Sequence, residues 1–72
     1  MSAHSGALEA VERILNRGGE AETVLTAVAA ILGRRLDRAV EVSADGFVVA
    51  GELDDDGRAL VERVTLLASP YR

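Results

Sequence analysis

Apolar residues recur at helical spacing in three separate segments of the chain. In residues 6–17 they share one face and polar side chains take the other, which predicts an amphipathic helix. Its apolar positions include Leu8, Val11 and Leu15. Residues 20–36 have a wider apolar arc, so we expect this second helix to be the central and most buried one. Gly18 and Gly19 lie between the two and provide the left-handed position that ends the first helix.

A β-hairpin is predicted in residues 38–53, where β-branched residues recur on either side of Asp45 and Gly46. An Asp-Gly pair is typical of a type I′ turn, in which both central residues have positive φ. One face of the hairpin is then apolar and packs on the helices, while the other meets water. The expected cross-strand pairs are Ala44 with Phe47, Val42 with Val49 and Val40 with Gly51.

The third helical pattern follows an acidic segment and ends at Ser69 and Pro70. Its apolar stripe consists of Leu60, Val64 and Leu67, with Val61 and Ala68 beside it. One of three consecutive aspartates is expected to cap this helix, and the others lie where the helix dipole favours negative charge. These residues are Asp54, Asp55 and Asp56. Leu66 falls outside the stripe, on a second face with Ala59.

The element order is therefore α-α-β-β-α, and the predicted fold class is α+β with a two-stranded antiparallel hairpin packed on helices. We expect one small domain over residues 1–72, with residues 1–5 flexible. A chain of 72 residues builds only a small core, and without Cys and with one His it has neither disulfides nor a usual zinc site. Oligomerisation is the remaining means of stabilisation, so we expect the sheet to extend across a homodimer.

The charge of the chain disfavours two classes of partner. Its net charge is −4 and every cation is an arginine, so nucleic acid and anionic membrane are both unlikely partners. No apolar run approaches the ~20 residues that a membrane span requires. The first residues lack the basic and apolar regions of a signal peptide, which predicts a cytoplasmic location.

A calcium loop is the one metal site that the acidic segment suggests. Glu52, Asp54 and Asp56, followed by Gly57, have the alternate spacing that opens an EF-hand loop. Position twelve of that loop needs a glutamate and is Arg63 here, and the loop should follow a helix rather than a strand. A helix cap is the better interpretation, so we expect neither a metal nor another cofactor.

Other candidate chemistry is weak. Glu20 and Glu22 at the start of the second helix would repel a phosphate held after Gly18 and Gly19. His4 is the single conventional general base, and no nucleophile is placed to work with it, so we expect no enzyme activity. A winged-helix DNA binder is disfavoured too, because the second helix offers Ala, Thr and Glu where base contacts need Arg, Lys, Asn or Gln. The basic residues Arg34, Arg35 and Arg38 fit better at the C-terminal end of that helix.

Two stretches of the chain resemble parts of bacterial GAF domains. The stretch ALEAVERILNRGGEAETVLTAVAAILGRRL, followed by a strand, resembles their opening helices and first strand. The stretch GFVVAGELDDDGRALVERVTLLASPY resembles their late strand and closing helix. The middle of the GAF fold, which builds the ligand pocket, has no counterpart here, and neither has the motif Asn-Lys-Phe-Asp-Glu for cyclic nucleotides or a Cys for a chromophore. The resemblance implies a minimal GAF-like domain that keeps the helical face with which the family commonly forms dimers.

The sequence thus predicts a cytoplasmic, non-catalytic protein-interaction and dimerisation module of the kind used in signalling. The residues expected at its interface are Leu66, Ala59, Leu8, Val11, Leu15, Val40 and Val42. Two alternatives stay open. Dimerisation could build a small-ligand sensory site, or, less favoured, the module could bind DNA as a winged helix does.

Overall fold

The computed structural model describes residues 5–71. In this range the elements are α1 (Ser5–Arg17), α2 (Ala21–Leu36), β1 (Val40–Val42), β2 (Phe47–Val49), α3 (Asp55–Leu67) and the 3₁₀ helix η1 (Ser69–Tyr71). This order confirms the predicted α+β fold class. Ser5 is the first residue of α1, whereas the sequence placed it in a flexible segment; His4 and the residues before it lie outside the described range.

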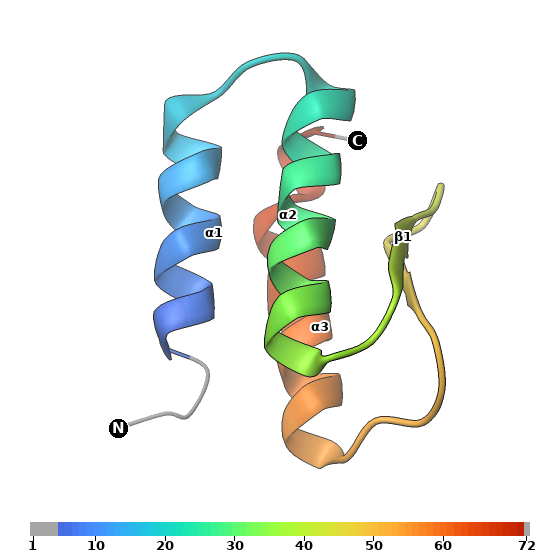
Figure 1. Ribbon diagram of the computed structural model, residues 1–72. Coiled ribbons are helices and arrows are strands. Elements are labelled where there is room, and N and C mark those ends of the chain that lie inside the picture. The colour runs from blue at the N-terminus through green and yellow to red at the C-terminus, as the bar shows by residue number, and fades with distance from the viewer. Residues whose placement is uncertain (1–4, 72) are drawn as a thin grey trace.

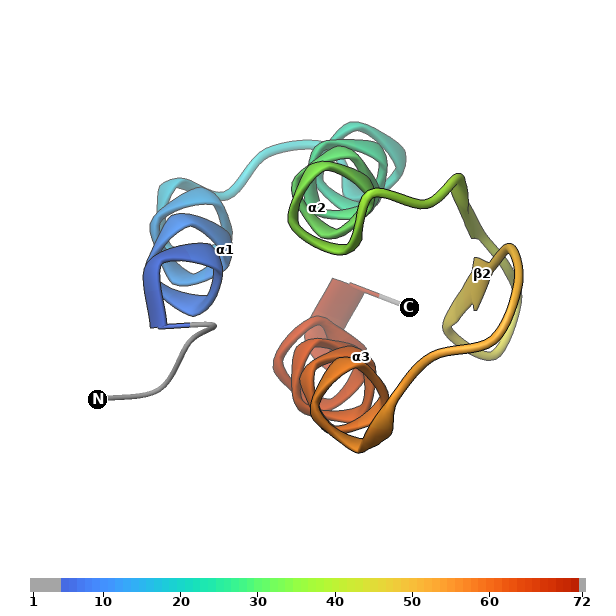
Figure 2. The same ribbon diagram turned by 60° about the horizontal axis from the view of Figure 1, so that its bottom comes forward.

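The three helices pack around a shared centre, and the hairpin lies beside two of them. α1 and α3 run in the same direction and α2 runs opposite to both (Figure 1). Seen nearly along the helix axes, the hairpin lies on the side of α2 and α3 that faces away from α1 (Figure 2). The hairpin is therefore an addition to a helical core and not its centre.

The core confirms that α2 is the central helix. It contributes Val24, Leu25, Val28, Ala29 and Leu32 to the buried residues. The largest fully buried side chains are Leu32, Val11, Val28 and Val64, which come from all three helices. Each helix therefore buries one apolar stripe against the other two, as its sequence pattern requires.

The helix ends follow from local backbone chemistry. Gly18 has a φ of 75° directly after α1, which confirms the predicted glycine terminator. α2 continues through Gly33 to Leu36 as predicted, and Asp37 ends it in the left-handed conformation with a φ of 55°. A Cβ on Gly33 would lie 3.0 Å from the backbone oxygen of Arg38, so only glycine lets the chain turn back this closely.

The predicted turn and register of the hairpin are wrong. Neither Asp45 nor Gly46 has positive φ, so the turn is not type I′. The strands pair Val40 with Val49, Glu41 with Val48 and Val42 with Phe47, two residues away from the expected register. Ser43 closes the connection, since its N–H donates to the Gly46 carbonyl at 2.8 Å and its Oγ accepts from the Gly46 N–H at 3.1 Å. A shift of two residues leaves every side chain on its predicted face.

One hydrogen bond caps the start of α3, and another joins the segment after α3 to α1. Asp54 is the N-cap of α3 and accepts a hydrogen bond from the Gly57 N–H at 2.7 Å, which confirms the predicted aspartate cap. After α3, η1 brings Tyr71 across to α1, where its hydroxyl donates to the Leu15 carbonyl at 2.7 Å. That carbonyl belongs to the last turn of α1, where the acceptors have no helical partner of their own.

Candidate interaction surface

The most exposed large apolar side chain in the described residues is Leu66 on α3, which is 73% exposed. Ala59 is exposed too and lies seven residues earlier, on the same face of the helix. On the other face, Leu60 and Val64 are buried in the core. The prediction that Leu66 lies outside the buried stripe of α3 is therefore confirmed.

A shallow hollow lies directly beside Leu66. It is lined by Val61, Glu62, Thr65 and Leu66, and we call these four residues the α3 patch. The Thr65 hydroxyl donates to the Val61 carbonyl at 2.7 Å, so its hydrogen bond is made within the helix. A Cβ on Gly46 would lie 3.3 Å from Thr65 Cγ2, which places the connection of the hairpin next to the patch. The patch thus combines a projecting leucine with an adjoining depression.

The structure does not bring the seven predicted interface residues to one surface. Val11 is fully buried, so its side chain has no exposed area to offer a second copy. Leu8, Leu15 and Val40 are partly buried and pack against the core. Val42 is 40% exposed. Leu66 and Ala59 of α3 are the exposed members on a helix, and Val42 is the exposed member on the hairpin.

The outer edge of β1 is the second feature that a partner could use. Hydrogen bonds join Ala39 to Ala50 and Ser43 to Gly46 across the hairpin. In an antiparallel pair the bonded and non-bonded positions alternate, so the backbone groups of Val40 and Val42 point away from β2. The extension of the sheet across a homodimer stays a prediction, and these two residues are the ones that would make its bonds. Strands of only three residues limit the length of such pairing.

The acidic segment is arranged as a helix start. Asp55 and Asp56 are exposed in the first turn of α3, and Asp55 lies 3.6 Å from Arg58 in a solvent-exposed ion pair. Within residues 5–71, no three His, Cys, Asp or Glu side chains are grouped so that they could hold a metal ion. The Asp54 side chain, which the calcium interpretation would assign to the metal, accepts the capping hydrogen bond instead.

The arginines gather near the C-terminal end of α2, as predicted. Arg34 and Arg35 are in its last turn, where they complement the helix dipole. Arg35 and Arg38 also line a shallow hollow together with Glu52 and Asp54. Carboxylates next to the arginines lower the local positive potential, which makes this end a poor site for a nucleic-acid phosphate.

The hydrogen bond between the Tyr71 hydroxyl and the Leu15 carbonyl of α1 could not be predicted from the sequence, because Tyr71 and Leu15 are 56 positions apart.

Among the helices that the structure describes, none has the length and apolar character needed to cross a membrane. No family model, curated protein or solved structure matches this chain. The resemblance to GAF domains therefore rests on the sequence patterns alone.

Proposed function

We propose that this chain is a non-catalytic protein-interaction module that works as a homodimer, with the α3 patch at its interface. The observation that carries the proposal is the 73% exposure of Leu66 beside the hollow of the same patch. An isologous dimer needs one surface that is complementary to itself. A leucine and an adjoining depression meet that need, because a two-fold axis places each leucine against the hollow of the other copy.

The size of the chain supports self-association. A domain this small has a net stability of only ~3–5 kcal/mol from a single core. Burying an exposed leucine side chain contributes about 2 kcal/mol. A two-fold interface counts this contribution twice, so two copies of Leu66 would supply about 4 kcal/mol of the association energy. Ala59 is on the same face of α3, and its small side chain leaves room for the partner helix to approach.

The test is sedimentation equilibrium of the parent chain and of Leu66→Ala and Leu66→Glu. Loss of both leucine contacts should weaken association about a thousandfold, and Leu66→Glu should weaken it further because it brings like charges together in the interface. Both variants should keep the stability of the monomer within ~0.5 kcal/mol, since the side chain is mostly exposed.

Val48→Glu is the matched control. Val48 is 56% exposed on the hairpin, so the same type of change is made at an exposed apolar residue outside the α3 patch. It should leave the association constant unchanged. A monomeric parent chain at every concentration would refute the proposed function, and equal association of the parent and Leu66→Glu would remove the α3 patch from the interface.

A further inference from the structure

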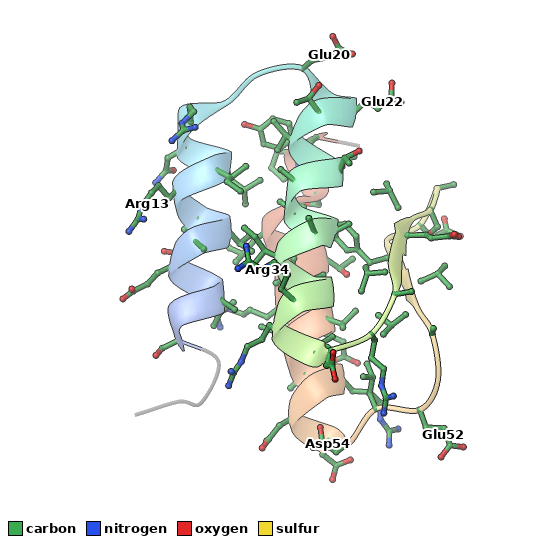
Figure 3. The ribbon with its side chains drawn as sticks, in the orientation of Figure 1. Arg13, Glu20, Glu22, Arg34, Glu52 and Asp54 are labelled. Carbon is green, nitrogen blue, oxygen red and sulfur yellow. The ribbon has the colours of Figure 1, made fainter. Side chains whose placement is uncertain are left out.

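The outer face of α2 carries no charge along its middle and opposite charges at its two ends. Between Glu22 and Arg34 the exposed residues are Thr23, Thr26 and Ala30, and the half-exposed ones are Ala27, Ile31 and Gly33. The acidic end has the N-cap residue Glu20 and Glu22 of the first turn, and the basic end has Arg34 and Arg35, all of them exposed. Figure 3 shows both glutamates at one end of α2 and Arg34 farther along it, with Glu22 on the hairpin side of the helix and Arg34 on the α1 side. Glu20 is the glutamate in line with Arg34, because Glu20, Ala27 and Arg34 are each seven residues apart. A helix that only met water would more often carry charged residues along its exposed middle.

We infer that this face of α2 is a second two-fold interface, on which α2 of another copy packs in the antiparallel direction. This inference rests on the proposed function, because it assumes that the chain associates with itself. Antiparallel packing places the acidic end of each helix against the basic end of the other. The two-fold axis thus produces two pairs of opposite charges, one at each end of the helix pair. A second copy of the chain meets the charge pattern of this face, and no other partner is required.

The dimensions of α2 agree with this arrangement. Glu20 and Arg34 are fourteen residues apart, or about 20 Å along the helix axis. A two-fold axis at Ala27, midway between them, places Glu20 of each copy opposite Arg34 of the other. The residues near that axis are small, so the helices can approach to about 8 Å, the close end of the usual range for packed helices.

The hollow between α1 and α2 widens the same face. It is lined by Ala7, Ala10, Ile31, Arg34 and Arg35. The alanines of α1 leave space beside α2, and Ile31 adds an apolar contact at the point where a partner helix would cross. Val28 and Leu32 of α2 face the core, so this exposed face lies on the opposite side of the helix. The α3 patch and the α2 face share no residue, so α2 packing would join α3 dimers into a larger assembly.

The test uses two charge-reversed variants, Arg34→Glu and the double variant Glu20→Arg with Glu22→Arg. The first puts a carboxylate at the position that faces Glu20 of the other copy, and the second puts arginines at the end that faces Arg34. Each alone should associate through α2 about a hundredfold more weakly, because like charges meet at both ends. An equimolar mixture should recover the association as a heterodimer. Placing all variants in the Leu66→Glu background isolates this interface from the α3 patch.

Arg13→Glu is the matched control for Arg34→Glu. It changes the net charge by the same amount, and Arg13 is exposed on α1 and points away from α2 (Figure 3). It should leave association unchanged. Sedimentation equilibrium that shows weakened single variants and a recovered mixture supports the α2 interface. Unchanged association of the reversed variants, or a mixture that does not recover, overturns it, and the α3 dimer then stands or falls separately with Leu66.

Discussion

Removal of the Asp54 side chain tests how much one hydrogen bond contributes to this small domain. In the variant Asp54→Ala, the Gly57 N–H loses its acceptor, which lies 2.7 Å away in the structure. Gly57 is buried, so water does not readily replace the lost oxygen. We expect the free energy of unfolding to fall by about 1 kcal/mol, which corresponds to about 4–8 °C in Tm for a domain of this size.

The neighbouring aspartates provide the comparison. Asp55→Ala and Asp56→Ala remove an exposed charge from the same helix end without removing the cap, so each should cost only about 0.3 kcal/mol and the loss should diminish in high salt. The triple variant should lose about 1–2 kcal/mol. Asp54→Ser keeps an oxygen at the capping position and should stay within a few tenths of a kcal/mol of the parent.

The assay is urea unfolding for the free energies and a thermal scan for Tm, both followed by circular dichroism with and without calcium. Equal losses for all three single alanine variants would refute the capping argument, because the structure assigns the hydrogen bond to Asp54 alone. A rise of several degrees in Tm on adding calcium would refute the assignment of the acidic segment as a helix start.

Two other variants test features outside the proposed interfaces. Tyr71→Phe removes the hydroxyl that donates to the Leu15 carbonyl, so it should lower the free energy of unfolding by about 1 kcal/mol, as measured by urea unfolding. An unchanged free energy would show that water replaces this bond. Asp37→Gly keeps the positive φ after α2 but removes its steric cost, so it should raise Tm by a few degrees in a thermal scan. Asp37→Ala is the control, because alanine keeps that cost. A lower Tm for the glycine variant would contradict the helix-end geometry.

The helices could be predicted from the sequence because their determinants are local. The spacing of apolar residues, Gly18 at the end of α1 and the aspartates before α3 all act within a few residues of the structure that they specify. The exposure of Leu66 followed from the same periodicity, since it lies outside the stripe that includes Leu60 and Val64. The surface position of Leu66 in the candidate site could therefore be predicted from the sequence.

The hairpin register could not be predicted from the sequence, because tertiary contacts decide it. Asp45 and Gly46 favour a type I′ turn locally, but Gly46 packs beside Thr65 of α3, where a Cβ would be only 3.3 Å from the threonine methyl group. The connection therefore uses its glycine for close packing and not for positive φ. The hollow beside Leu66 could not be predicted either, because its shape depends on the side-chain conformations of Val61 and Thr65 in the folded helix.

The hydrogen bond between Tyr71 and Leu15 also has a consequence for the order of folding. It spans 56 positions, almost the whole described chain, whereas the helices and the hairpin form from contacts between near neighbours. Closing so long a loop has a large entropic cost, so we expect this bond to form after the local elements have met. A late bond slows unfolding and leaves the refolding rate nearly unchanged. We therefore expect the hydroxyl of Tyr71 to act mainly on the lifetime of the folded state, so Tyr71→Phe should speed unfolding.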